Sequence, residues 1–190
     1  MAFLSQQKLA EIGFLSIGGN VLISERASIF GAARIRIGCN VRIDDFCILS
    51  AGEKGISLGN YIHVACYTSL IGKERITLSD FSNLSSRVSI YSSNDDYSGS
   101  HMTNPMVPPE LTNVAHLPVS IGRHCIVGSG TIILPGVIME EGSAVGALSL
   151  VTKKCETFGI YAGVPARFLK ARTKTLLETE KAFLDRNKSI

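Results

Sequence analysis

Aliphatic residues recur at intervals of six along most of this 190-residue chain. They fall into six groups of three, and neighbours in a group are six positions apart. A period of six matches neither the 3.6-residue repeat of an α-helix nor one long alternating strand, so it predicts short strands separated by regular corners. The eighteen positions are Ile17, Ile23, Ile29, Ile37, Ile43, Leu49, Leu58, Val64, Leu70, Leu78, Leu84, Ile90, Ile121, Val127, Ile133, Met139, Val145 and Val151.

A second series of small residues lies four positions after many of these aliphatic residues. One large and one small inward side chain in each hexad would fill the interior of a narrow triangular prism. Glycine often follows the aliphatic residue directly, which we attribute to the backbone angles that glycine tolerates at a corner. The small series comprises Ala27, Ala33, Cys47, Thr68, Ser82, Cys125, Thr131, Ser143, Ser149 and Cys155, so we interpret its three cysteines as core residues.

Three hexads make one triangular coil, and coils begin at 17, 37, 58, 78, 121 and 139. The long interval before residue 121 predicts that a loop over 91–118 leaves the prism, and loops of this length are often functional. We expect a single domain over 1–190, with an N-terminal cap at 1–16, a β-helix at 17–155 and a C-terminal segment with a helix at 156–190.

Helices are predicted near both termini of the chain. Ser5 is a suitable N-cap for the first helix, and Gly13 is a suitable stop. The second helix is predicted over 173–184. Because both ends of a prism expose unpaired strand edges, we interpret both helices as covers for those ends.

The composition argues against several classes of protein. A net charge of +3 without a Lys/Arg run is too dilute for a nucleic-acid surface. No window approaches the roughly 20 apolar residues of a membrane span, and the N-terminal residues lack the apolar core of a signal peptide. The five cysteines include no CxxC pair. We therefore expect a soluble, cytoplasmic protein with reduced cysteines.

The run IGRHCIVGSGTIILPGVIMEEGSAVGALSLVTK, followed by GIYAGVPARFLK, resembles the hexapeptide-repeat acyltransferase superfamily. The resemblance covers about 17–171 and is closest to galactoside and maltose O-acetyltransferases and to acetyltransferases of surface-polysaccharide (O-antigen) synthesis. It implies an all-β fold, a left-handed parallel β-helix of about six coils. It also implies acetyl-CoA as acyl donor, a sugar or nucleotide-sugar acceptor, and a homotrimer with active sites between prisms.

Five positions match those that line the coenzyme A groove of the galactoside-type enzymes. Small residues at some of them would admit the thin pantetheine arm. The cationic side chains of Lys153 and Arg167 would pair with the phosphates of the nucleotide. The resemblance assigns this donor-binding role to Ser129, Ala147, Thr152, Lys153 and Arg167.

The catalytic base departs from the family pattern. In the galactoside-type enzymes a histidine lies five residues after the last aliphatic residue before the loop, and counting from Ile90 puts Asp95 there. We predict that His116 is the base and that Asp95 orients it, with His101 and Asp96 as alternatives. An amine acceptor could instead attack when neutral and pass its proton to a carboxylate or to the leaving thiolate.

Alternative functions remain open at this point. One is a non-catalytic hexapeptide-repeat scaffold, and another is a metal hydratase related to γ-carbonic anhydrases. The hydratase needs three convergent histidines, whereas His63 and His124 have no third partner at a matching position. We therefore predict no metal site and expect both histidines to point outward. The missing loop histidine favours an amine acceptor, while the overall resemblance favours a hydroxyl.

Overall fold

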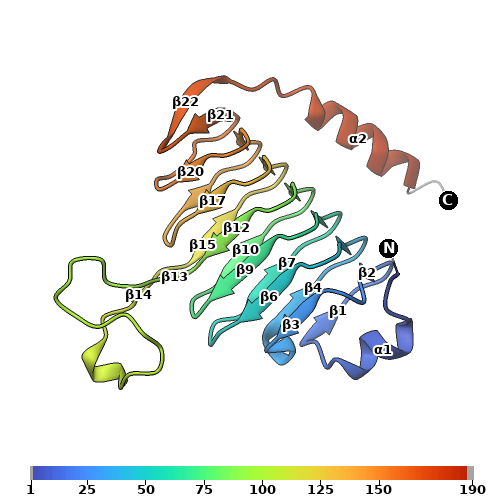
Figure 1. Cartoon of the computed structure of the whole chain (residues 1–190). Helices are drawn as coiled ribbons and strands as arrows, with labels where there is room; N and C mark the ends of the chain where they lie inside the picture. Colours follow the sequence, from blue (N-terminus) through green and yellow to red (C-terminus); the bar gives the residue numbers. More distant parts are fainter. Residues whose placement is uncertain (1, 188–190) are drawn as a thin grey trace.

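The computed structural model describes residues 2–187 and shows a triangular prism of stacked coils (Figure 1). Each coil passes through three parallel sheets in turn. The first sheet contains β1 (Ser16–Ile17), β4 (Ile35–Ile37), β7 (Ile56–Leu58), β10 (Ile76–Leu78), β15 (Val119–Ile121) and β18 (Ile138–Met139). The second contains β2 (Leu22–Ile23), β5 (Arg42–Ile43), β8 (His63–Val64), β11 (Asn83–Leu84), β16 (Ile126–Val127), β19 (Ala144–Val145), β21 (Gly159–Gly163) and β22 (Ala166–Ala171). The third contains β3 (Ser28–Phe30), β6 (Ile48–Ala51), β9 (Ser69–Gly72), β12 (Ser89–Tyr91), β17 (Ile132–Ile133) and β20 (Leu150–Val151).

Six coils are complete, and β21 begins a seventh, so the predicted β-helix is confirmed. We name the corners after the sheets that they join: the 1–2 corner, the 2–3 corner and the 3–1 corner. Loop 91–118 leaves the prism at a 3–1 corner, as the interval in the repeat predicts. Among the described residues, no helix is long and apolar enough to cross a membrane.

The repeat places one aliphatic side chain directly above another. Leu58, for example, pairs in register with Ile37 on one side and with Leu78 on the other. Sixteen of the eighteen predicted aliphatic residues are buried. The exceptions, Ile17 at 37% exposure and the half-buried Ile29, lie in the first coil, which has a neighbouring coil on one side only.

The small series fills the remaining interior space, as predicted for eight of its ten members. The buried Thr131 hydroxyl, for example, donates to the carbonyl of Gly146 at 3.1 Å, whereas the buried Ser82 hydroxyl has no hydrogen-bond partner among the described residues. Burial raises the pKa of the Cys47 and Cys155 thiols to about 11, as expected for core cysteines. Ala27 is half-buried, and Ala33 is exposed because it lies in the short 3-10 helix η1 (Ala32–Arg34).

The corner glycines have a different role from the predicted one. Glycines that follow the aliphatic residues, such as Gly128, have no positive φ. Positive φ angles at corners fall instead three residues after the aliphatic position, both at larger residues such as Tyr61 and Phe81 and at glycines such as Gly130. A Cβ on Gly128 would collide with the backbone of Ala147 in the next coil. Close stacking of coils, rather than backbone freedom, therefore selects glycine here.

The N-terminal prediction is confirmed by α1 (Gln6–Glu11). The Ser5 side chain accepts a hydrogen bond from the backbone of Lys8, and Gly13 ends the segment at a φ of 75°. Leu9 is buried in the core, and the Lys8 ammonium pairs with Glu25 at 2.8 Å. The helix thus covers the N-terminal end of the prism (Figure 1).

The C-terminal end is covered by a hairpin rather than by the predicted helix. Strand β22 pairs antiparallel with β21 above the last coils. Helix α2 (Leu176–Asn187) then runs back beside the prism (Figure 1). Its Phe183 ring meets those of Tyr61 and Phe81 edge-on, with centroids 5.3 and 6.3 Å away. The apolar residues of this helix therefore pack against the 1–2 corner, and the end-cap interpretation is wrong.

A matched pair of substitutions tests the stacking constraint. We expect Gly128→Ala to lower the free energy of unfolding by about 1–3 kcal/mol because the new methyl group must displace backbone. Gly19→Ala is the control, since its Cβ would meet nothing within 4 Å. Urea midpoints of the two variants should differ clearly. Equal midpoints would show that coil spacing does not select glycine at position 128.

Candidate active site

The base of loop 91–118 is tied to the prism by a short antiparallel ladder. Strand β13 (Ser93–Asn94) pairs with β14 (Ala115–His116), with Ser93 opposite His116. The buried Ser92 hydroxyl donates to the carbonyl of Glu74 at 2.6 Å. The backbone N–H of Lys73 donates to the Ser93 hydroxyl at 2.9 Å. These bonds fix the direction in which the loop leaves the 3–1 corner.

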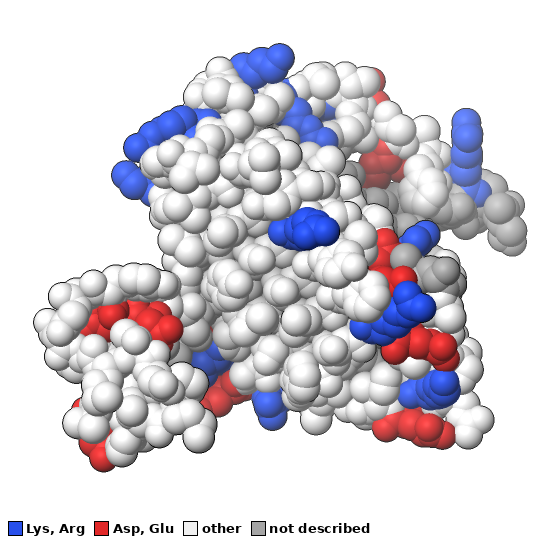
Figure 2. Space-filling view, in the orientation of Figure 1, with Lys and Arg blue, Asp and Glu red and all other residues white. Residues whose placement is uncertain are grey.

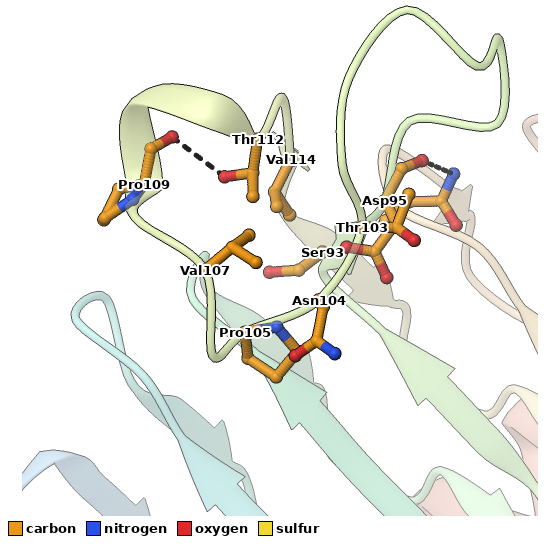
Figure 3. A pocket seen from close by; sticks show the side chains of 10 residues that line it. Ser93, Asp95, Thr103, Asn104, Pro105, Val107, Pro109, Thr112 and Val114 are labelled. Carbon is orange, nitrogen blue, oxygen red and sulfur yellow. Dashed lines mark hydrogen bonds between the residues drawn. The ribbon is translucent and has the colours of Figure 1, made fainter.

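The loop encloses a pocket of about 360 Å³ (Figure 3). One side of its lining is polar and includes Ser93, Asp95 and Asn104. Proline and valine side chains, among them Pro105 and Val107, line the rest. The short 3-10 helix η2 (Pro109–Leu111) closes the outer turn of the loop. A pocket with an apolar wall and a few polar groups suits a small organic ligand.

A second cavity, of about 580 Å³, lies between the loop and the outer face of the third sheet. Tyr97 borders it from the loop, and Tyr91, Ile132 and Leu150 border it from the third sheet. Asp95 lines both this cavity and the loop pocket. The Asp95 carboxylate therefore stands where the two spaces meet.

The charged side chains of the loop, histidines apart, are all acidic. Residues 91–118 contain three carboxylates, Asp95, Asp96 and Glu110, and neither lysine nor arginine. Figure 2 shows this acidic surface on the protruding loop, next to a prism face that carries few charges. A surface of this sign attracts a cationic ligand.

The predicted pairing of His116 with Asp95 remains a prediction. The Nδ1 atom of His116 lies 2.8 Å from the Ser93 hydroxyl, and the side chain is half-buried at the loop base. Within residues 2–187, no hydrogen bond or ion pair joins His116 to Asp95. His116 is also absent from the lining of both cavities. In this chain alone, therefore, Ser93 is the partner of His116.

A different histidine and carboxylate pair within the loop. His101 Nδ1 lies 2.8 Å from Asp96 Oδ2, and the backbone N–H of Ser98 donates to Asp96 Oδ1 at 2.8 Å. Hydrogen bonds from Ser98, followed by the bond with His101, lower the pKa of Asp96 to about 2. These alternative candidates thus come together, and they close a turn of the loop.

His63 points outward, as predicted, but it is not isolated. Its Nε2 atom lies 2.8 Å from Asp44 Oδ2, and its side chain is 41% exposed. Asp44 also accepts a hydrogen bond from the Arg42 guanidinium at 2.7 Å. Burial alone would raise the pKa of Asp44, but these two partners outweigh burial and lower it.

His124 differs from its predicted surface position. Its side chain is only 10% exposed because α2 covers it, and its Nε2 atom lies 2.9 Å from Glu180. Its ring stacks on Phe81 with centroids 5.1 Å apart. Burial, followed by the charge of Arg123, lowers the pKa of His124. Among residues 2–187, no group of three or more His, Cys, Asp or Glu side chains could hold a metal.

The predicted donor-binding residues are all exposed, and they fall into two groups. Ser129 and Ala147 occupy the 2–3 corners of adjacent coils, where the Leu148 N–H donates to the Ser129 carbonyl at 2.8 Å. Arg167 pairs with Ala162 in the hairpin above them. Thr152 and Lys153 follow β20 at a 3–1 corner. The outer face of the third sheet, which carries Ile132 and Leu150, lies between the two groups.

Comparison with known proteins shows which family of enzymes the chain resembles. No protein-family model matches the chain. It is 55% identical over 183 residues to dTDP-4-amino-4,6-dideoxy-D-glucose acyltransferase from Escherichia coli, covering 96% of this chain and 95% of that protein. It is 29% identical over 148 residues to the putative lipopolysaccharide biosynthesis O-acetyl transferase WbbJ from Escherichia coli K12, covering 76% and 72%.

A solved structure agrees over nearly the whole chain. It is that of AntD, an N-acyltransferase from Bacillus cereus, in complex with dTDP and 3-hydroxybutyryl-CoA. The TM-score is 0.94 at 46% identity, with 98% of both chains covered. A variant of the same enzyme, in which alanine replaces a serine, is solved with dTDP-4-amino-4,6-dideoxyglucose and coenzyme A. Its TM-score to this chain is also 0.94.

The fold and these similarities define a hexapeptide-repeat enzyme that transfers acyl groups from coenzyme A to sugars. Within that class, the chain belongs to the family of the dTDP-4-amino-4,6-dideoxyglucose acyltransferases. The predicted left-handed β-helix, acyltransferase activity and acyl-CoA donor are confirmed at this level.

Proposed function

We propose that this enzyme transfers an acyl group from a coenzyme A thioester to the 4-amino group of dTDP-4-amino-4,6-dideoxyglucose. The observation that carries the proposal is the position of Asp95. Its carboxylate lies between the loop pocket and the cavity beside the third sheet, within an acidic loop. An amino sugar is cationic before it reacts, and a carboxylate attracts it, whereas a sugar hydroxyl gains nothing from this charge.

The substrates named for the relatives also support the amino sugar as acceptor. The Escherichia coli relative, at 55% identity, acts on this nucleotide-linked amino sugar, and the AntD structures hold dTDP or the amino sugar together with coenzyme A. This similarity favours the amine over the hydroxyl, a choice that the repeat and the motifs leave open. The relative WbbJ is named for lipopolysaccharide biosynthesis. We accordingly propose a role in surface-polysaccharide assembly, in the cytoplasm.

The proposed reaction is direct transfer. The bound ammonium first gives up one proton, and the neutral amine then attacks the thioester carbonyl carbon, so that a C–N bond forms and the C–S bond breaks. The nitrogen releases a second proton as the amide forms, and the coenzyme A thiolate finally receives one proton. Asp95 would hold the amine by a charge-assisted hydrogen bond. His116 is the predicted carrier of the proton, with Asp95 as its predicted partner.

The donor would lie across the third sheet. Its thin pantetheine arm can cross the apolar outer face, past Ile132 and Leu150. Ser129 and Ala147 would border the arm at the 2–3 corner, and Thr152 would border it at the 3–1 corner. Lys153 and Arg167 would pair with the phosphates. We further propose a homotrimer with active sites between neighbouring prisms.

A substrate screen tests the proposed function. Acetyl-CoA and longer acyl-CoA thioesters are combined with dTDP-4-amino-4,6-dideoxyglucose or with simple glycosides, and release of free thiol is followed. We expect release with the amino sugar and none with the glycosides. Release with a glycoside, and none with the amino sugar, would instead favour O-acetylation.

Substitutions at the loop test the proton route. If His116 carries the proton, His116→Ala lowers the turnover number by roughly 10²–10⁴ and leaves the KM for acyl-CoA nearly unchanged. Asp95→Asn then lowers turnover less, and the double variant is little worse than His116→Ala because the pair acts as a unit. Near-normal turnover in both single variants would assign the proton to the leaving thiolate.

Arg167 and Lys170 give a matched test of the donor site, because both are exposed on β22. Losing a charge-assisted contact costs about 1.5–3 kcal/mol, so Arg167→Gln should raise the KM for acyl-CoA by roughly 10- to 150-fold. Its effect on the acceptor KM should be small. Lys170→Gln should change neither constant. Similar changes in the acceptor and donor constants would contradict the assignment of Arg167.

A further inference from the structure

Tyr97 projects from the first part of loop 91–118 and is 86% exposed. It nevertheless borders the cavity beside the third sheet, together with Ile132 and Leu150 on the prism. Tyrosine supplies a large contact area to a ligand at a small cost in conformational entropy. The loop side of this cavity therefore carries an aromatic ring that a bound ligand can cover.

The turn around Tyr97 is held by the Asp96 carboxylate. Asp96 Oδ1 accepts a hydrogen bond from the backbone N–H of Ser98, and Asp96 Oδ2 lies 2.8 Å from His101 Nδ1. The backbone N–H of Ser100 donates to the Ser98 hydroxyl at 3.1 Å. Bonds from its own side chains thus give this turn a defined shape.

The direction of the bond between His101 and Asp96 follows from the state of the carboxylate. Because the pKa of Asp96 is about 2, Asp96 is ionised at neutral pH and can only accept hydrogen bonds. His101 therefore carries a proton on Nδ1 and donates it to Asp96. The Asp96 side chain is only 11% exposed, so it points into the turn. We call this pair the His101–Asp96 clasp.

The clasp separates neighbouring side chains onto two sides of the chain. Asp96 faces the interior of the turn, whereas Asp95 and Tyr97 both line the cavity beside the third sheet. Side chains two positions apart in an extended segment point to the same side, so fixing Asp96 also fixes the direction of its two neighbours. Neither Asp96 nor His101 lines this cavity or the loop pocket. Their influence on a ligand is therefore indirect.

The walls of the cavity indicate which part of a substrate Tyr97 can cover. The third sheet contributes apolar side chains, including Leu134, and the lining contains neither lysine nor arginine. A phosphate group gains no charged partner there, whereas the pantetheine arm fits the apolar wall. The thioester at the end of that arm must approach Asp95 to meet the amine. The Tyr97 ring, two residues from Asp95, can then close over the thioester.

We propose that Tyr97 is a lid side chain that packs over the thioester end of acyl-CoA, and that His101 and Asp96 are positioning residues that hold Tyr97 there. The inference rests on the proposed function, since it takes the donor to cross the third sheet toward Asp95. Water that attacks the thioester carbonyl carbon forms a C–O bond as the C–S bond breaks, and yields a free carboxylic acid and coenzyme A. A lid side chain limits this hydrolysis and leaves the amine as the nucleophile.

Substitution of Tyr97 tests the lid. We expect Tyr97→Ala to weaken acetyl-CoA binding by roughly 5- to 30-fold in a calorimetric titration, because the bound donor loses its aromatic cover. The ratio of free carboxylic acid to amide product should rise as well. Tyr97→Phe keeps the ring and should restore both values. Met106→Ala is the matched control, because Met106 is 89% exposed on the same loop and lines neither cavity.

Variants of His101 test the clasp. His101→Ala should weaken acetyl-CoA binding about as much as Tyr97→Ala does, and the double variant should be little worse, because both changes act through the same ring. His101→Asn keeps an N–H group at the position of Nδ1 and should recover most of the affinity. Recovery by asparagine distinguishes positioning from acid–base chemistry, since an amide does not titrate.

Three outcomes would contradict the proposal, with the fold of each variant checked by circular dichroism. Unchanged acetyl-CoA affinity and hydrolysis in Tyr97→Ala would overturn it. Weaker binding of the amino sugar with normal acetyl-CoA binding would instead assign Tyr97 to the acceptor. Additive losses in the Tyr97→Ala/His101→Ala variant would remove the positioning role of His101. The proposed function fails in a different way: the unaltered enzyme then forms no amide from the amino sugar, and the acetyl-CoA titration still decides whether Tyr97 covers the donor.

Discussion

Close stacking of the coils is the constraint on which this structure depends. Hydrogen bonding between coils sets a spacing near 4.8 Å, and the chain must keep that spacing at every corner as well as along the sheets. Inside the prism, the spacing aligns aliphatic side chains into columns, as with Ile37, Leu58 and Leu78. At the corners, it excludes even a methyl group at positions such as Gly128. The regular prism leaves little room for a binding cavity in its interior.

The candidate binding surfaces therefore lie where a loop interrupts the regular stack, or where outward side chains differ from coil to coil. The loop supplies Asp95 and a pocket, and its base is held by hydrogen bonds that Ser92 and Ser93 make with the preceding coil. The third sheet supplies an apolar outer face beside the loop. A cavity on the N-terminal coils, lined by Arg34, Arg36 and Arg75 among others, supplies positive charge. These surfaces differ in sign and polarity because corner residues, unlike inward residues, are free to vary.

The two ends of the prism are protected in different ways. At the N-terminal end, α1 inserts Leu9 into the open first coil. At the C-terminal end, antiparallel pairing of β22 with β21 satisfies the strand edge, so no helix is needed there. Helix α2 is then free to pack along the 1–2 corner, where the rings of Tyr61 and Phe81 already stack on each other. This placement buries His124 and pairs it with Glu180.

The sequence by itself determined the register of the prism, the position of the loop and the N-terminal cap. It could do so because a period of six leaves only one set of aliphatic residues facing inward, and because the Ser5 cap is a local interaction. The motif near the C-terminal coils also indicated the family and its acyl donor.

Outward side chains carry no such periodic signal. Only the tertiary structure could therefore show that His116 bonds to Ser93, that His101 bonds to Asp96, and that His124 lies beneath α2. Those partners come from distant coils or from the fold of the loop. The tertiary structure alone likewise brought Arg34, Lys54 and Arg75 to one cavity, because residues about twenty positions apart meet only when the coils stack.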